Sequence, residues 1–347
     1  MFSPLPSVTC DKPRADVTKV RFAPSFRRSI LRSVLPLVAL VTALAFSAGA
    51  GASPRQIQLG LFGDPARFAS LTGQQTQVRH IFTTFRPSPA LDRIISETGP
   101  VPMLALVPGS YGHAVTATPE GIAKGKNDAF LFQLNAAIAA YSGSLFYLRP
   151  FPEMNGYWES NCAYNQNGTL RPADDSVAWS RKAFARIAII TRGGTAAEIN
   201  AKLARLHLPG INQDLPVTTP KLKLVWNPQG FGAPDLPGNS ANAYYPGNAY
   251  VDLVADDLYD IAGHGATWAA AQKLYDSHPS KPFGFGEWGL WGIDDPSFVR
   301  EMAAWVHTHR RLVLLSFFNY SPGSIWDIHD KPASAAAYRK YISPLGS

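Results

Sequence analysis

The chain has 347 residues, 46% of them hydrophobic and only 16% charged, so it can build a substantial core and is not intrinsically disordered. No apolar run reaches the roughly 18–20 residues that span a bilayer, which excludes a polytopic membrane protein. The net charge of +7 suggests nucleic-acid binding, but residues 1–52 hold seven of the basic residues against two Asp, and the rest is close to neutral. We therefore expect no nucleic-acid partner.

The N-terminal segment, residues 1–52, has the pattern of a secretory signal. Arg27, Arg28 and Arg32 precede an uncharged apolar stretch at 34–46, and a string of small residues follows. Positive, apolar and small residues in this order are typical of an export signal and its cleavage site. An uncleaved membrane anchor is the alternative interpretation. We expect a secreted or periplasmic protein with no stable membrane partner.

Residues 53–347 are expected to form a single domain, because no linker, low-complexity segment or solenoid repeat divides them. Cys10 lies in the leader, which leaves Cys162 alone, so stability depends on a core and not on disulfides. Short runs, apolar throughout, alternate with helical patterns, as is typical of strands that are covered on both faces. The eight runs are Ile57–Phe62, Val78–Phe85, Pro102–Val107, Ser144–Pro150, Leu222–Asn227, Val251–Tyr259, Phe283–Glu287 and Leu312–Asn319.

The spacers between these runs carry the spacing of amphipathic helices. Thr195 and Glu198 have the spacing of a capping box ahead of one of them. Eight strand–helix units in one domain predict an α/β fold, a single (β/α)₈ TIM barrel, with loop insertions at Pro228–Gly247 and Thr195–His207. A doubly wound open sheet is the alternative, but no Gly-rich loop follows the first run. Helical patterns occupy residues 91–95, 131–138, 177–190, 199–206 and 298–309.

Two glutamates stand where the catalytic groups of such a barrel lie, at the ends of strands. Glu153 follows the fourth run and Glu287 ends the seventh, so we expect them to face each other across the barrel mouth. Two carboxylates about 5–5.5 Å apart suit double displacement at an acetal carbon. We assign Glu153 as the acid/base and Glu287 as the nucleophile. The alternative for Glu153 is a loop carboxylate that is paired with Arg149 and has no catalytic role. The alternative for Glu287 is a charge on the rim of the barrel.

The segment Arg149-Pro-Phe-Pro-Glu-Met-Asn-Gly-Tyr-Trp158 resembles the acid/base motif of glycoside hydrolase family 26, the β-mannanase family of a large retaining (β/α)₈ clan. Three further segments resemble its later motifs in the expected order: Val225–Pro228, Tyr244–Tyr259 and Phe285–Gly289. The resemblance implies Glu153 as the acid/base, Glu287 as the nucleophile and Tyr259 as the hydroxyl that orients the nucleophile. The family usually has His before the acid/base, where this chain has Pro152, which leaves the preferred sugar open.

Aromatic side chains indicate a surface for sugars, because rings stack on the apolar faces of sugars while polar groups bind their hydroxyls. We expect Trp226 and Trp326 at the central subsite, with Trp158 and Trp288 nearby. For any single Trp, packing in the core is the alternative. Arg149 is expected to orient Glu287 or the adjacent network, and a structural ion pair in the barrel interior is the alternative. Asn155 would bond a sugar hydroxyl or cap its loop, and His80 would line the cleft or be structural. Five of the eight Trp lie at or just beyond strand ends: Trp158, Trp226, Trp288, Trp291 and Trp326.

The sequence carries neither a transition-metal spacing of His, Asp and Glu nor a Gly-x-Ser-x-Gly elbow, so we expect no metal and no cofactor. Together these features predict an exported, monomeric, retaining β-glycosidase that hydrolyses mannan or glucomannan. One alternative keeps the mechanism and changes the substrate to β-glucan, β-1,3-xylan or a bacterial exopolysaccharide. The other is a catalytically silent barrel that only binds carbohydrate.

Overall fold

The computed structural model describes residues 56–97, 99, 101–109 and 115–346, and the predicted leader lies outside these residues. Eight parallel strands close into a barrel in chain order, because the first strand pairs with both the second and the eighth. This confirms the predicted single (β/α)₈ barrel. The strands are β1 (Gln58–Phe62), β2 (Val78–Thr84), β3 (Val101–Val107), β4 (Phe146–Pro150), β5 (Leu222–Trp226), β6 (Leu253–Ile261), β7 (Phe283–Trp291) and β8 (Leu312–Phe318).

All eight predicted runs are strands, but β6 and β7 extend past the predicted ends. The pairing of β7 with β6 shifts register beside Asp256 and Asp257, and its pairing with β8 shifts between Phe285 and Trp288. Such bulges re-aim side chains without ending a strand. As a result Glu287, predicted to end its strand, lies inside β7.

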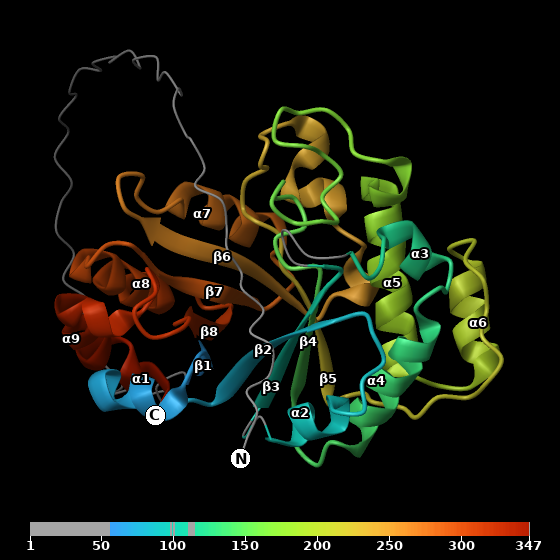
Figure 1. The fold of residues 1–347 in the computed structure, drawn as a ribbon, viewed down its shortest axis with the longest axis horizontal. Coiled ribbons are helices and arrows are strands. Elements are labelled where there is room, and N and C mark those ends of the chain that lie inside the picture. The colour runs from blue at the N-terminus through green and yellow to red at the C-terminus, as the bar shows by residue number, and fades with distance from the viewer. Residues whose placement is uncertain (1–55, 98, 100, 110–114, 347) are drawn as a thin grey trace, which may run out of the picture. The chain divides into compact units, whose positions relative to one another are not determined.

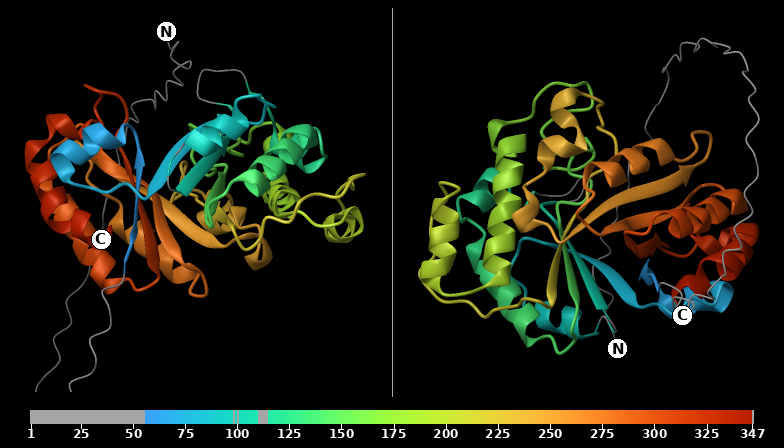
Figure 2. Two further views of the ribbon diagram at one scale, coloured as in Figure 1. Left: turned by 90° about the horizontal axis from the view of Figure 1, so that it is seen from below. Right: turned by 180° about the vertical axis from the view of Figure 1, so that it is seen from behind.

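Helices cover the outside of the barrel (Figure 1), and Figure 2 shows this arrangement from two further sides. The five segments with helical patterns coincide with α2 (Leu91–Glu97), α4 (Asp128–Ala140), α5 (Val177–Arg192), α6 (Ala196–Ala204) and α8 (Pro296–Thr308). The capping box of Thr195 and Glu198 is formed at α6. Among the described residues, no helix is both long and apolar enough to cross a bilayer. The helices are α1 (Pro65–Thr72), α2 (Leu91–Glu97), α3 (Pro119–Ala123), α4 (Asp128–Ala140), α5 (Val177–Arg192), α6 (Ala196–Ala204), α7 (Trp268–Ser277), α8 (Pro296–Thr308) and α9 (Pro332–Tyr341).

The barrel interior is built in levels, because side chains on a strand alternate between its two faces. A lower apolar cluster includes Val78 on β2 and Ala255 on β6. One pleat further along these strands come the buried polar residues His80 and Asp257. An aromatic cluster follows at the next level, formed by Tyr259, Phe318 and Trp326 with Phe62, Phe82, Ile261, Trp291 and Tyr320. The polar level is thus enclosed between an apolar floor and an aromatic rim.

The segments that follow β4 and β5 are tied to each other by backbone hydrogen bonds. Tyr157 N donates to Ala233 O at 2.8 Å, and Ala233 N donates to Asn155 O at 3.0 Å. The side chain of Asn239 also donates to Asn155 O, at 2.8 Å. The predicted insertion at Pro228–Gly247 therefore packs on the turn that carries Glu153.

Candidate active site

Glu153 lies in a strained turn just after β4. Phe151 and Glu153 have φ angles of 54° and 52°, in the left-handed region that side-chain-bearing residues rarely adopt, and Pro152 stands between them. Strain of this kind costs on the order of 1–3 kcal/mol for each residue and persists only where surrounding contacts enforce it. Here Phe151 N donates to Leu106 O at 3.0 Å and Glu153 N donates to Asn227 O at 2.8 Å. The turn is thus fixed between β3 and the end of β5.

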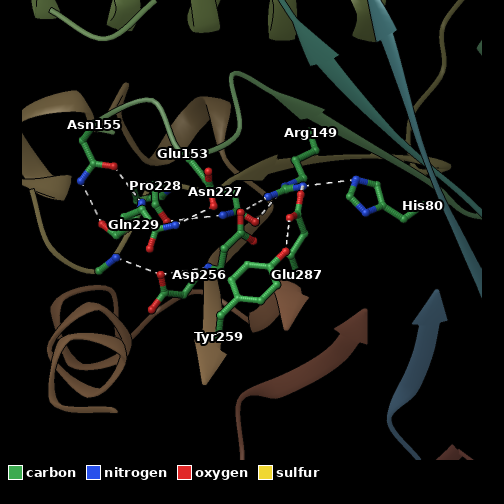
Figure 3. Close-up of polar contacts among 12 residues, drawn as sticks. His80, Arg149, Glu153, Asn155, Asn227, Pro228, Gln229, Asp256, Tyr259 and Glu287 are labelled. Atoms are coloured by element: carbon green, nitrogen blue, oxygen red, sulfur yellow. Dashed lines mark hydrogen bonds and ion pairs between the residues drawn. The ribbon is translucent and has the colours of Figure 1, made fainter. Parts of the chain in front are cut away.

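The carboxylate of Glu153 is buried and is held by two neutral donors. Its Oε2 accepts a hydrogen bond from the indole Nε1 of Trp158 at 2.5 Å. Its Oε1 accepts one from Gln229 Nε2 at 2.6 Å (Figure 3). Neither partner carries charge, so the carboxylate is oriented without a direct ion pair to either of them.

Glu287 has a different environment, because a cation and a phenol hold its carboxylate. Arg149 donates to Oε1 at 2.7 Å, and the hydroxyl of Tyr259 donates to Oε2 at 2.5 Å (Figure 3). Burial raises the pKa of Tyr259 well above its ordinary value, and the charge of Glu287 adds to this, so the phenol stays protonated as a donor. Both contacts favour the ionised form of Glu287.

Arg149 is completely buried at the centre of the polar level. It also donates to Asp257, to Asn227 Oδ1 at 2.9 Å and to His80 Nε2 at 3.2 Å. Burial opposes its charge, but the negative charges of Asp257 and Glu287 outweigh burial and raise the pKa of the guanidinium. One guanidinium therefore serves two buried carboxylates, those of Asp257 and Glu287.

Three carboxylates converge at this site. Glu153, Asp257 and Glu287 each place one oxygen so that the three atoms lie within 4.8 Å of one another. Oxygens of this type also suit a hard cation, but the guanidinium of Arg149 already supplies positive charge to Asp257 and Glu287. The separation of Glu153 and Glu287 is shorter than the roughly 6.5–9.5 Å of inverting glycosidases.

His80 has the structural one of its two predicted roles. Burial, followed by the charge of Arg149, lowers its pKa to about 3, so the ring is neutral and accepts from Arg149.

Gly286 leaves space for the hydrogen-bond network around Arg149. A Cβ at position 286 would lie 1.9 Å from Asn227 Oδ1, so only glycine leaves room for Asn227 to reach Arg149.

The prediction that Trp226 and Trp288 line the sugar subsites is wrong. Both side chains are 0% exposed. Trp226 packs edge-on against Tyr245, and Trp288 stacks on Tyr338 of α9 at a ring-centroid distance of 5.5 Å. The physical reason is alternation: each Trp is next to a residue that points into the barrel, and so each faces the helix layer.

Asn155 does not line the cleft either, since its side chain is 0% exposed. Its Nδ2 donates to the carbonyls of Gln229 and Phe231, both at 2.9 Å, and its Oδ1 accepts from Gln229 N at 2.8 Å. The side chain is thus fully engaged with the loop after β5. Of its two predicted roles, loop capping is the one that these contacts support.

Trp158 and Trp326 remain near the site. Trp158 is partly exposed beside Glu153, and Trp326 belongs to the aromatic cluster. That cluster adjoins the Glu287 side of the site, because the ring centroids of Phe318 and Trp291 each lie 6.0 Å from that of Tyr259.

Sequence reasoning missed three residues of the site: Asp257, Asn227 and Gln229. Asp257 precedes Tyr259 by two residues, so strand alternation could have placed both on the inner face. Asn227 directly follows Trp226, so the same alternation places the side chain of Asn227 on the inner face when that of Trp226 faces outward. No local signal marks Gln229, because it lies in an irregular loop that is positioned by long-range contacts.

No family model and no curated protein matches the chain. Solved structures do match it. A Bacillus subtilis mannanase is 17% identical, with 84% of this chain and 87% of that chain covered and a TM-score of 0.53. The catalytic domain of a family 26 endo-β-1,4-mannanase from a Bacillus species is 14% identical, with 84% of this chain and 87% of that chain covered and a TM-score of 0.53. An endo-β-1,4-mannanase double mutant from Cellulomonas fimi is 16% identical, with 84% of this chain and 71% of that chain covered and a TM-score of 0.56. The chain has the fold of the family 26 mannanases.

Proposed function

We propose that the protein is an exported, monomeric glycoside hydrolase that cleaves a β-linked polysaccharide with retention of configuration. Mannan or glucomannan is the leading substrate. One observation carries the proposal: two buried glutamates, Glu153 and Glu287, offer oxygens within 4.8 Å of each other and have unlike partners. The fold, which the chain has in common with solved mannanases, agrees with it.

Glu287 has the environment of a nucleophile. Arg149 and Tyr259 stabilise its ionised form, so one oxygen can attack the anomeric carbon of the bound sugar. A new bond forms between Glu287 and that carbon as the bond to the leaving sugar breaks. The product of this step is a glycosyl ester on Glu287.

Glu153 has the environment of the acid/base. In the first step it gives a proton to the leaving oxygen, so that the departing sugar leaves as an alcohol. In the second step it takes a proton from water as the water oxygen attacks the anomeric carbon and the ester on Glu287 breaks. Neutral donors suit this group, because it must alternate between two protonation states, whereas the guanidinium suits a group that stays charged.

The remaining aromatic residues suggest where the sugars lie. The nucleophile marks the sugar that becomes covalently bound, so the aromatic cluster with Trp326, next to Tyr259, would bind the non-reducing side of the chain. Trp158, beside Glu153, would lie near the leaving sugar. These positions do not decide the sugar, and β-glucan, β-1,3-xylan and a bacterial exopolysaccharide stay open as substrates.

A substrate panel tests the function. Reducing ends released from mannan, glucomannan, β-glucan and xylan are measured, and the anomer formed first is identified by NMR. We expect hydrolysis of mannan or glucomannan with the β-anomer formed first. Release from another polysaccharide alone would change the substrate, and the α-anomer first would refute retention. Binding without any release would show a silent carbohydrate-binding barrel.

Single substitutions test the two roles. Glu287→Ala and Glu153→Ala should each lower kcat by several orders of magnitude. With an activated aryl glycoside and azide, Glu153→Ala should give the β-glycosyl azide by two displacements, whereas Glu287→Ala should give the α-glycosyl azide by a single displacement. Glu120→Ala is the control, because Glu120 lies on the surface in an ion pair with Lys124. Normal turnover by Glu287→Ala would refute the mechanism.

A further inference from the structure

We propose that Gln229 is a positioning residue for the acid/base, an inference that rests on the proposed function of Glu153. Gln229 lies in the loop after β5 and is 5% exposed. Its Nε2 donates to Glu153 Oε1 at 2.6 Å (Figure 3). In this role it fixes the plane of the carboxyl group and thereby the direction in which the proton is delivered.

Two donors hold the Glu153 carboxylate, one on each oxygen. Trp158 holds Oε2 at 2.5 Å, and Gln229 holds Oε1 at 2.6 Å. Loss of the donor on Oε1 would give the carboxyl group more freedom to rotate about its last carbon–carbon bond, a torsion with a broad and shallow energy profile. With a donor on each oxygen the plane is defined, and proton transfer depends steeply on such alignment.

Gln229 is itself held rigidly, which a positioning residue requires. Its backbone N donates to Asn155 Oδ1 at 2.8 Å, and its carbonyl accepts from Asn155 Nδ2 at 2.9 Å (Figure 3). The next residue, Gly230, donates its N–H to Asp256 Oδ1 at 2.8 Å. The loop is therefore clamped between the turn after β4 and strand β6, and Asn155 acts on Glu153 through Gln229.

The chemistry of the amide also fits this position. A lysine or arginine here would bind the charged carboxylate strongly and hinder its return to the acid form. A glutamine N–H donates a hydrogen bond without adding charge. After a flip of the side-chain amide, the glutamine carbonyl can accept a hydrogen bond from the protonated carboxyl group. A neutral amide therefore accommodates both protonation states of Glu153.

The test exploits the leaving group. A sugar alkoxide needs the proton from Glu153, whereas 2,4-dinitrophenolate leaves without one. In Gln229→Met, we expect kcat/KM for mannopentaose to fall about 10- to 100-fold, and kcat/KM for 2,4-dinitrophenyl β-mannobioside to fall less than about 3-fold. The matched control is Gln213→Met, because Gln213 is exposed in the segment between α6 and β5.

Each alternative result has a distinct meaning. Equal losses on both substrates would overturn the positioning role, because they would indicate general damage to the site, and so would no loss on either. Inactivity of the unaltered protein on both mannosides would remove mannan as the substrate, and the same pair of substrates would then be built from the sugar that the polysaccharide panel identifies. Inactivity on every polysaccharide of the panel would overturn the proposed function, and the inference with it. Azide rescue of Glu153→Ala checks the role of Glu153 separately.

A second variant covers the case in which Gln229→Met does not fold. Gln229→Glu keeps the size of the side chain and puts a second carboxyl group on Glu153 Oε1. Two such groups share a proton and release it at higher pH than one alone. The alkaline limb of the pH profile for mannopentaose should therefore move upward by about one pH unit or more. An unmoved limb would overturn the inference.

Discussion

Removal of the central guanidinium should convert the site into a cluster of mutually repelling acids. Arg149 is buried and pairs with both Asp257 and Glu287. In Arg149→Met a side chain of similar length fills the space, but no cation remains among carboxylates whose oxygens lie within 4.8 Å of one another. Because a buried charge without a partner is unstable, the folded variant should neutralise part of this cluster by binding protons.

The expected loss follows from the burial of the pairs. Breaking a buried ion pair on one side costs about 3–5 kcal/mol, a large part of the roughly 5–15 kcal/mol that stabilises a folded protein. The variant should also gain a pH dependence. The folded state now binds more protons than the unfolded state between about pH 4 and 8, so its free energy of unfolding falls as the pH rises, by about 1.4 kcal/mol per pH unit for each extra proton.

Chemical denaturation at a series of pH values from 4.5 to 8 measures both effects. The control is Arg192→Met, because Arg192 is partly exposed in its pair with Asp252 and should lose about 1 kcal/mol or less, with no new slope. If Arg149→Met and the unaltered protein gave parallel curves of unfolding free energy against pH, the electrostatic account of this site would be wrong.

Three further predictions concern single residues. Tyr259→Phe removes the hydroxyl that donates to Glu287 at 2.5 Å, so kcat should fall about 10- to 100-fold while the melting temperature falls by only a few degrees, and an unchanged kcat would contradict the role of this contact. Trp288→Ala should lower the free energy of unfolding by about 3–5 kcal/mol in guanidinium denaturation, because the side chain is fully buried, and a loss below about 1 kcal/mol would contradict that burial. Burial, with a smaller effect of nearby negative charge, raises the pKa of Asp256 to about 7. The folded state therefore holds this proton more tightly than the unfolded state, so stability declines as pH rises from about 4 through 7, and Asp256→Asn should flatten that decline in denaturation curves at pH 4.5, 6 and 7.5.

The barrel could be predicted from the sequence because strands covered on both faces leave a strong pattern. The run Pro102–Val107 is apolar throughout, and it is buried from Pro102 onward in β3. The extra length of β7 could not be predicted, because it depends on register shifts that only the neighbouring strands determine. The bounds of helix α1 have only a weak periodic signal, because its apolar stripe is short, although Asp64 caps it and Pro65 opens it.

Strand ends drew attention to Glu153 and Glu287, although Glu287 lies inside β7, but they did not indicate which way the neighbouring side chains face. A Trp after a strand has the same sequence signature whether it lines a cleft or fills the helix layer. The orientation of the adjacent residue distinguishes the two cases, because neighbouring side chains on a strand face opposite ways: if Glu287 points inward, Trp288 points outward. Gln229 is a different case, because an irregular loop has no periodicity, and its place beside Glu153 depends on contacts with residues more than seventy positions away.

The levels of the barrel interior explain why one guanidinium can serve this site. The polar residues between the apolar floor and the aromatic cluster are almost fully buried, and electrostatic interactions are stronger where little water surrounds the charges. The same burial would make three ionised acids untenable without Arg149, and it makes the position of each hydrogen-bond donor matter. The neutral donors on Glu153 and the charged donor on Glu287 therefore divide two chemically identical side chains into an acid/base and a nucleophile, which is the asymmetry that double displacement requires.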